Sequence, residues 1–246
     1  MIEKRQIRIR YLNQDRTLHI YTPPGFNSKT KLPVLYMFDG HNLFYDSDAT
    51  YGKSWGLSSY LDAHNINLIV VGIECNHEGN ERINEFSPYS FNDEYIGKIK
   101  GTGNQFLKFI VEELKPFIDE FYHPQSGKQT TYIGGSSMGG LMSIAGIIKY
   151  NNVFDAAICI SSYLNKVKVP LLKDIKKAGN LSGRVYLSWG EYESNNLKAD
   201  SLAQLEVASS LTASGLLVFP ELVKDGTHNE KSWETLIPDF INKLNI

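Results

Sequence analysis

The 246-residue sequence contains only two cysteines, Cys75 and Cys159, and both lie in apolar runs. We expect each to be a buried free thiol rather than half of a disulfide or a metal pair. No apolar run reaches the ~18 residues of a membrane-spanning helix. The first ten residues, MIEKRQIRIR, are charged and alternating, without the apolar stretch of a secretory signal. We therefore expect a cytoplasmic protein that does not associate with a membrane.

The sequence also has no excess of basic residues. Lysine and arginine number 25 against 27 aspartates and glutamates, which gives a formal net charge of -2 at pH 7. Without a basic stripe, no nucleic-acid partner is expected. Internal repeats and low-complexity tracts are missing as well, which argues against a repeat architecture. A chain of this length and ordinary composition can bury one large core, so we expect a single domain over residues 1–246.

Short apolar segments separated by helical patterns make up most of the chain. Two alternating segments, residues 4–12 and 16–23, predict an antiparallel hairpin. Nearly continuous apolar runs, typical of parallel strands buried on both faces, cover residues 32–38, 66–73, 130–135, 154–161, 184–190 and 216–222. Together they predict an α/β fold with about eight mostly parallel strands flanked by helices, the first two strands forming the antiparallel hairpin.

The helices are predicted from apolar residues spaced three and four apart, as in residues 104–122, 201–214 and 231–244. Two stretches, residues 75–103 and 162–182, lack such a pattern and are predicted to be long loops. Both follow predicted strands, so we expect them near the carboxyl edge of the sheet, where open α/β sheets bind ligands.

One turn carries a motif for nucleophilic chemistry. Residues 132–140 read YIGGSSMGG and fit G-x-S-x-G with Ser137 at the centre, after a predicted strand and before a predicted helix. A serine on such a sharp turn has a strained backbone, and side chains at Gly135 and Gly139 would collide with each other and with neighbouring strands. Ser137 is therefore the candidate nucleophile; a glycine-rich turn without chemistry is the alternative.

A serine nucleophile needs a base and an acid that follow it in the order serine, acid, histidine. Of the six histidines, only His228 follows Ser137, in a glycine-containing loop after the last predicted strand, so it is the candidate base. The acid is expected after the strand at 184–190. Glu193 is favoured over Glu191 because it has more room past the turn to fold back under the base. Asp200 and Asp225 are weaker candidates.

An oxyanion hole needs two main-chain N–H donors. One should come from Met138, which follows the nucleophile, and one from the segment MFDGHNLFYDSD after the third strand. Gly40 lets this segment turn, so the amide of His41, or less favourably that of Asn42, can face the serine. Each such donor typically contributes about 10² to 10³ in rate.

The same segment could suggest a metal, because Asp39, His41, Asp46 and Asp48 are all ligand types. Their spacing fits neither an EF-hand nor a zinc signature. We therefore expect no metal and no cofactor, and interpret Asp39 as a structural acceptor that braces the loop.

With these residues the sequence resembles the putative esterase (esterase D-like) family of α/β-hydrolases. The resemblance rests on LPVLYMFDGHNLF, VVGIECNHEGNERINEFSP, FLKFIVEELKPFIDEFY, YIGGSSMGGLMS, VFDAAICISS, VYLSWGEYE and DGTHNEKSW, from about residue 30 to the end. It implies an α/β-hydrolase fold with Ser137 as nucleophile, His228 as base, and the amides of His41 and Met138 as oxyanion hole. In relatives the acid tends to close a Gly-x-x-acid pattern, which here ends at Glu193.

The resemblance extends to an R-x-x-E element, Arg82 to Glu85, which we expect to be an ion pair supporting a loop. It implies a serine carboxylesterase that acts on a small-molecule ester of short-chain or aromatic acyl type. Two alternatives stay open: an acyltransferase on the same triad, and a non-catalytic binding module on this fold. The aromatic residues expected to wall the pocket are Phe44, Tyr45, Trp55 and Tyr89.

Overall fold

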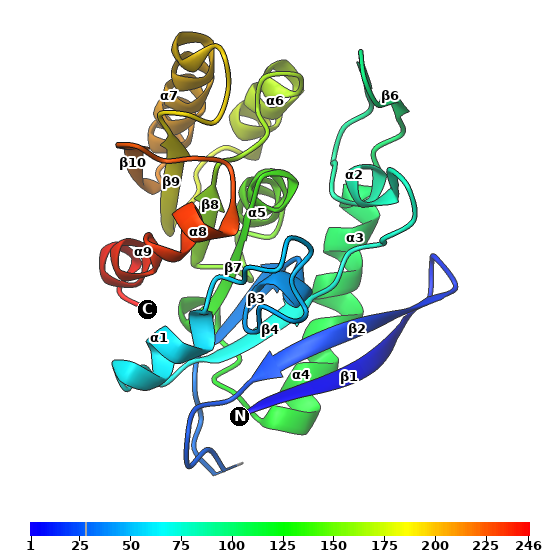
Figure 1. Cartoon of the computed structure of the whole chain (residues 1–246), viewed down its shortest axis with the longest axis vertical. Coiled ribbons are helices and arrows are strands. Elements are labelled where there is room, and N and C mark those ends of the chain that lie inside the picture. Colours follow the sequence, from blue (N-terminus) through cyan, green and yellow to red (C-terminus); the bar gives the residue numbers. More distant parts are fainter. Residues whose placement is uncertain (28) are drawn as a thin grey trace.

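An eight-stranded sheet runs through the computed structural model, which describes residues 1–27 and 29–246 (Figure 1). Its strands, in spatial order, are β1 (Ile2–Ile9), β2 (Gln14–Tyr21), β4 (Ile69–Ile73), β3 (Val34–Phe38), β7 (Thr131–Ser136), β8 (Ala156–Ile160), β9 (Arg184–Gly190) and β10 (Leu217–Val223). β2 pairs antiparallel with both β1 and β4, and the other neighbours are parallel. The predicted sheet and its antiparallel first two strands are confirmed.

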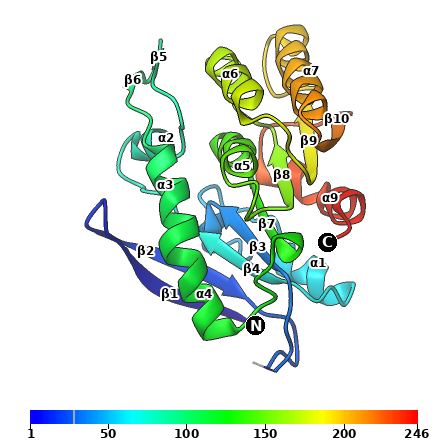
Figure 2. The ribbon, with the colours of Figure 1, turned by 180° about the vertical axis from the view of Figure 1, so that it is seen from behind.

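Helices cover both faces of the sheet, as the opposite views of Figures 1 and 2 show. The helical elements are η1 (Gly40–Asn42), α1 (Leu57–Ala63), α2 (Glu81–Glu85), α3 (Gly103–Phe109), η2 (Ile110–Leu114), α4 (Lys115–Tyr122), η3 (Lys128–Thr130), α5 (Met138–Lys149), α6 (Lys168–Ala178), α7 (Leu197–Ala213), α8 (Glu230–Glu234) and α9 (Ile237–Leu244). Among the helices in this described part of the chain, none combines the length and apolarity needed to span a bilayer.

The core is split into two layers by the alternation of side chains along each strand. In β3, Tyr36 and Phe38 join the cluster that contains the apolar residues of α3 to α7. Leu35 and Met37 point the other way, into the cluster of α1, α8 and α9. All five residues of β3 are buried, which explains why its sequence is apolar without interruption.

The prediction that residues 75–103 and 162–182 form long loops is partly wrong. Residues 162–182 contain α6, and residues 75–103 contain α2 and a small hairpin of β5 (Phe91–Asp93) and β6 (Gly97–Ile99). The helix α6 was missed because its buried apolar stripe is short, with Leu171 and Ile175 as its fully buried members. The predicted helix at 231–244 is two helices, α8 and α9, and the second has a proline in its first turn.

The parallel strands place the loops of interest at one edge of the sheet. β3, β4, β7, β8, β9 and β10 all run in the same direction, so the segments after their carboxyl ends lie side by side. Those segments carry His41, His77, Ser137, Glu193 and His228. Residues far apart in sequence can therefore form one site.

Candidate active site

Ser137 occupies a strained turn between β7 and α5. Its backbone has φ 56° and ψ -118°, a conformation that non-glycine residues rarely adopt. A Cβ built on Gly135 would lie 3.0 Å from the main chain of Gly139, and one built on Gly139 would lie 2.9 Å from Cβ of Phe38. The two glycines therefore permit the close packing that holds the serine at the carboxyl end of the sheet.

Ser137 and His228 line the same cavity, whose volume is about 320 Å³. The serine is half-buried, while the His228 side chain is 41% exposed. The other residues around the cavity come mostly from the segments after β3 and β4 and from the loop leading into α8: Asp39, His41, Asn42, Thr50, Tyr51, Cys75, Asn76, His77, Gly79, Arg82, Ser136, Glu230 and Trp233. The structure thus places the two residues on which the sequence interpretation depends around one cavity.

Glu193 lies beside Nδ1 of the His228 imidazole. Its Oε2 is 3.4 Å from Nδ1 of His228, and the Glu193 side chain is 13% exposed. Its Oε1 accepts hydrogen bonds from the main-chain N–H of Gly190 at 2.6 Å and from the Ser161 hydroxyl at 2.5 Å. Two further donors thus hold this carboxylate in place beside the histidine.

The other candidate acids have different partners. Glu191 accepts a hydrogen bond from the main-chain N–H of Asp225 at 3.2 Å. Asp200 accepts hydrogen bonds from the side chains of Asn165 and Ser194. Among the carboxylates that the structure describes, Glu193 is the one within ion-pair distance of His228.

Ser161 and Trp233 support this arrangement and were missed by the sequence interpretation. The indole N–H of Trp233 donates a hydrogen bond of 2.8 Å to the Ser161 hydroxyl, which in turn donates to Glu193. The Trp233 ring also packs edge-on against His228, with 5.3 Å between ring centroids. The available signals were weak: Ser161 ends a predicted strand and Trp233 lies close after His228 in sequence.

The main-chain N–H groups of His41 and Met138 donate no hydrogen bond to any described residue. Asn42, the less favoured candidate, donates its main-chain N–H to the carbonyl of Asp39 at 2.9 Å. Gly40 allows this turn to lie against β4, because a Cβ there would come within 2.4 Å of the Gly72 carbonyl carbon. Two unpaired amides are thus present on segments that border the cavity.

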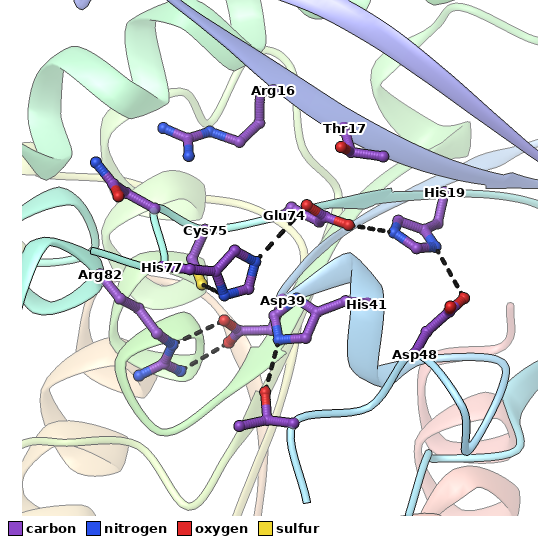
Figure 3. A network of polar contacts seen from close by, with 12 residues as sticks. Arg16, Thr17, His19, Asp39, His41, Asp48, Glu74, Cys75, His77 and Arg82 are labelled. Carbon is purple, nitrogen blue, oxygen red and sulfur yellow. Dashed lines mark hydrogen bonds and ion pairs between the residues drawn. The ribbon is translucent and has the colours of Figure 1, made fainter. Parts of the chain in front are cut away.

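An ion pair with a buried carboxylate braces the turn that carries His41. Asp39 is 5% exposed, has φ 57°, and accepts hydrogen bonds from Nε and Nη2 of Arg82, both at 2.7 Å (Figure 3). Burial alone raises the pKa of the Asp39 carboxyl, but the Arg82 guanidinium outweighs it and holds that pKa below its ordinary value. The interpretation of Asp39 as a bracing acceptor agrees with this geometry.

The expected ion pair between Arg82 and Glu85 is not formed. Arg82 bonds Asp39, and Glu85 instead pairs with Arg16 at 2.5 Å and accepts a 3.0 Å hydrogen bond from the Asn76 main chain. Asp39 and Glu85 are both buried, so each pairs with the cation that the tertiary structure places beside it. For Glu85 that cation is Arg16 rather than the nearby Arg82.

A third buried acid, Glu230, joins the two sides of the cavity. The amide nitrogen of the Asn42 side chain donates a hydrogen bond of 3.0 Å to Glu230, which is 4% exposed. Burial raises the pKa of the Glu230 carboxyl. This bond connects the segment that bears His41 with the segment that bears His228, and no local sequence signal indicates it.

The prediction that four aromatic residues wall the pocket is wrong for the cavity that holds Ser137, because none of them lines it. Phe44 and Trp55 are buried in the core layer of α1, α8 and α9. Tyr45 is 49% exposed on the surface. Tyr89 borders another cavity and donates its hydroxyl to Asp174 at 2.8 Å. Phe44 and Trp55 therefore pack in the core, and Tyr45 and Tyr89 lie outside the cavity that holds Ser137.

Comparison with known proteins shows the family of this chain. The profile of the putative esterase family matches residues 9–243, nearly the whole chain. The chain belongs to this family. The esterase is 26% identical over 186 residues to uncharacterized protein YbbA of Bacillus subtilis (strain 168), which covers 73% of this chain and 69% of that protein.

Solved structures show that the esterase has the α/β-hydrolase fold. An IroE-like serine hydrolase from Shewanella oneidensis superposes with a TM-score of 0.75 at 18% identity, covering 98% of this chain and 81% of the other. An S-formylglutathione hydrolase (FrmB) from Staphylococcus aureus superposes with a TM-score of 0.71 at 16% identity, covering 98% and 95%. By its family, the protein is a carboxylic ester hydrolase.

Proposed function

We propose that the esterase is a serine carboxylesterase with Ser137 as nucleophile, His228 as base and Glu193 as acid. The observation that carries the proposal is that Ser137, on its strained turn, and His228 line one cavity, while the Glu193 carboxylate lies behind the imidazole at 3.4 Å. This is the order of groups that a serine hydroxyl needs to become a nucleophile at neutral pH.

In the proposed reaction Nδ1 of His228 keeps its proton toward Glu193, so Nε2 is free to act as base. As the Ser137 oxygen bonds to the ester carbonyl carbon, its proton passes to Nε2. The oxyanion accepts hydrogen bonds from the unpaired amides of His41 and Met138. Collapse of this intermediate expels the alcohol, which takes the proton from His228, and leaves an acyl group on Ser137.

Water completes the cycle. It attacks the acyl carbonyl while Nε2 of His228 takes its proton, and collapse returns that proton to the Ser137 oxygen as the carboxylic acid leaves. The 41% exposure of the His228 side chain favours hydrolysis over transfer to another alcohol, because solvent reaches the base. Product analysis with added alcohols separates the two: a transferase would release mainly the new ester.

We propose a small and polar acyl group as substrate. The cavity of about 320 Å³ is at the lower end of ligand pockets, and Asn42, Thr50, Asn76 and His77 line it with polar atoms. A p-nitrophenyl ester series of rising acyl length, with feruloyl and formyl-thioester substrates beside it, tests this. Fastest turnover is expected for the shortest acyl groups; a preference for long alkyl chains or feruloyl would contradict the assignment.

Labelling with a fluorophosphonate probe tests the nucleophile directly. The unmodified protein should be labelled and Ser137→Ala should not. Ser136→Ala is the matched control, because Ser136 is adjacent and lines the same cavity, yet should leave labelling intact. Failure of the unmodified, folded protein to react would favour the alternative of a binding module. The cytoplasmic location expected from the sequence stays a prediction.

A further inference from the structure

Three side chains that commonly bind transition metals meet at one side of the cavity. His41 belongs to η1, and Cys75 and His77 follow the end of β4 (Figure 3). One donor atom from each lies within 4.8 Å of the others. All three line the cavity that contains Ser137. Cys75 is 2% exposed, whereas the His77 side chain is 55% exposed, so the group is open to solvent on the side of His77.

Each imidazole has a polar group beside one of its nitrogens, Glu74 for His77 and Thr50 for His41. His77 Nε2 faces a carboxylate oxygen of Glu74 at 3.6 Å, and His77 Nδ1 lies 3.8 Å from the Cys75 sulfur. His41 Nε2 is 3.0 Å from the hydroxyl of Thr50. Such outer partners fix the tautomer and orient the other nitrogen as a ligand.

The second observation concerns His41 itself. The residue is 6% exposed, and its Nδ1 is a buried atom without a hydrogen-bond partner in the described part of the chain. Leaving a buried polar atom unpaired costs about 1 to 3 kcal/mol, so such atoms in native structures call for an explanation. A ligand bound between His41 and Cys75 would supply the missing partner.

The donor atoms of the three side chains are nearly as close together as the ligands of a tetrahedrally coordinated ion. Nitrogen and sulfur ligands of zinc lie roughly 3.3 to 3.6 Å from one another, given bonds of about 2.0 to 2.3 Å. The separation of 3.8 Å between Cys75 and His77 is near this range. Bringing donor atoms that lie up to 4.8 Å apart into this range requires a contraction of about 1.2 to 1.5 Å, to which rotation of the exposed His77 side chain can contribute.

The donor set also selects the kind of ion. Two imidazoles and a thiolate suit zinc and neighbouring transition metals, whereas magnesium and calcium prefer oxygen ligands. The charges of Asp39 and Glu74 beside the group favour a cation, and Arg82 opposes it but is already paired with Asp39. Of the ligand types weighed from sequence, Asp46 binds Ser54 and Asp48 binds Lys4, so His41 alone belongs to the described cluster.

We propose that His41, Cys75 and His77 bind one Zn²⁺-type ion, with the fourth coordination position toward the cavity. On binding, the Cys75 thiol releases its proton to solvent and the thiolate sulfur takes its place on the metal. The ion then occupies space in front of Ser137 and holds the turn that carries the His41 amide. Zn²⁺ should therefore inhibit ester hydrolysis; this inhibition, unlike the binding, rests on the proposed function.

Metal titration of the full, reduced chain tests the binding without using activity. Calorimetry with ZnCl₂ should give one ion per chain, and Co²⁺ should produce a thiolate-to-metal absorption band. Cys75→Ala and His77→Ala should each weaken Zn²⁺ binding by at least about 10-fold, and Cys75→Ala should abolish the band. The matched controls are Cys159→Ala, the other buried free cysteine, and His64→Ala, an exposed histidine elsewhere; both should bind like the unmodified protein.

Either of two results would overturn the site: no binding by the unmodified protein, or equal binding by Cys75→Ala and His77→Ala. Because His77 is exposed, His77→Ala keeps the test valid even where Cys75→Ala disturbs folding. For inhibition, each variant's p-nitrophenyl acetate hydrolysis is compared with and without Zn²⁺. Relief of inhibition in His77→Ala supports the placement in front of Ser137, and undiminished inhibition there overturns it. A protein that binds Zn²⁺ but hydrolyses no ester would refute the proposed function alone.

Discussion

The two sides of the active-site cavity are held in different ways. The N-terminal side, formed after β3 and β4, is fixed by the buried pair of Asp39 and Arg82, joined by two hydrogen bonds of 2.7 Å. The C-terminal side carries His228, whose side chain is 41% exposed, lies 3.4 Å from Glu193 and packs edge-on against Trp233. One side is fixed by a charged pair with two short hydrogen bonds, and the other holds its histidine by one longer polar contact and ring packing.

This difference matches what each side is proposed to do. An oxyanion hole works because its donors are already in position when charge develops, so the turn with the His41 amide benefits from a fixed support. A general base must exchange protons in turn with the serine, the leaving alcohol and water, so His228 benefits from access to solvent. Changes on the C-terminal side should therefore affect turnover most, and changes on the N-terminal side should affect stability as well.

The largest expected effect is that of removing the base. His228→Ala should lower kcat for p-nitrophenyl acetate by about 10⁴-fold or more, because the Ser137 hydroxyl then loses the group proposed to take its proton. The melting temperature should hardly change, since the side chain is exposed. A variant that keeps most of its turnover would show that His228 is not the base.

Exchanging the acid should have the next largest effect. Glu193→Gln should lower kcat by about 10³- to 10⁴-fold, because the amide no longer stabilises the charged imidazole or its tautomer. Glu191→Gln is the matched control two residues away and should leave turnover nearly unchanged, since Glu191 bonds the Asp225 main chain instead. An equal loss of kcat in both variants would contradict the assignment of Glu193 as the acid.

On the N-terminal side, Asp39→Asn should lower the free energy of unfolding by about 2 to 3 kcal/mol, because it leaves the guanidinium of Arg82 without its charged partner. Urea denaturation measures this. The control is Glu234→Gln, which breaks a surface pair with Lys53 whose side chains are 41% and 38% exposed. That change should cost less than about 0.5 kcal/mol. Similar values for both would mean that the buried pair does not brace the turn.

The contribution of Asp39 should also depend on pH. The Arg82 guanidinium, against the opposing effect of burial, keeps the pKa of Asp39 lower in the folded than in the unfolded protein. The folded state therefore binds fewer protons there, and the stabilisation is complete above the ordinary aspartate pKa. It should be lost as the pH falls through the lowered folded pKa. The stability gap between the unmodified protein and Asp39→Asn should narrow on acidification; a gap that widens would contradict this.

The smallest effect is expected from the support behind Glu193. Ser161→Ala removes the hydroxyl that joins Glu193 to Trp233, and should lower kcat by about 10-fold with little change in KM. Ser162→Ala is the control, because its buried hydroxyl has no hydrogen-bond partner among the described residues. If both variants turn over equally, Ser161 does not position the acid.

Much of the fold could be predicted because its central strands are buried on both faces. The run at 184–190, buried in all but its first residue, became β9 residue for residue, and the more exposed run at 216–222 became β10, shifted by one residue. Helix α6 was missed because a partly exposed helix carries a weak apolar pattern, and its position is decided by packing against α7. The turn at Ser137 was predictable from its local motif, because Gly135 is required by a contact with Gly139 four residues away, although Gly139 itself is required by the packing of Phe38.

The partners of buried charges could not be read from the sequence. Asn42 bonds Glu230 across 188 positions, and Arg82 bonds Asp39 across 43 instead of pairing with Glu85. Likewise, the sequence interpretation weighed Asp39, His41, Asp46 and Asp48 as metal ligands and rejected them on their spacing, whereas the fold groups His41 with Cys75 and His77. Such contacts depend on which strand ends become neighbours in the sheet, and the spacing of residues along the sequence does not predict that.

By itself, the sequence determined which segments form buried strands, where the serine turn lies, and that a histidine follows the last strand. Each of these features depends mainly on the chemistry of a few adjacent residues. Only the tertiary structure decided which carboxylate meets the histidine, which cation meets Asp39, and what lines the cavity. The physical reason is that a buried polar group must be paired, and its partner is whichever group the parallel sheet brings within hydrogen-bonding distance.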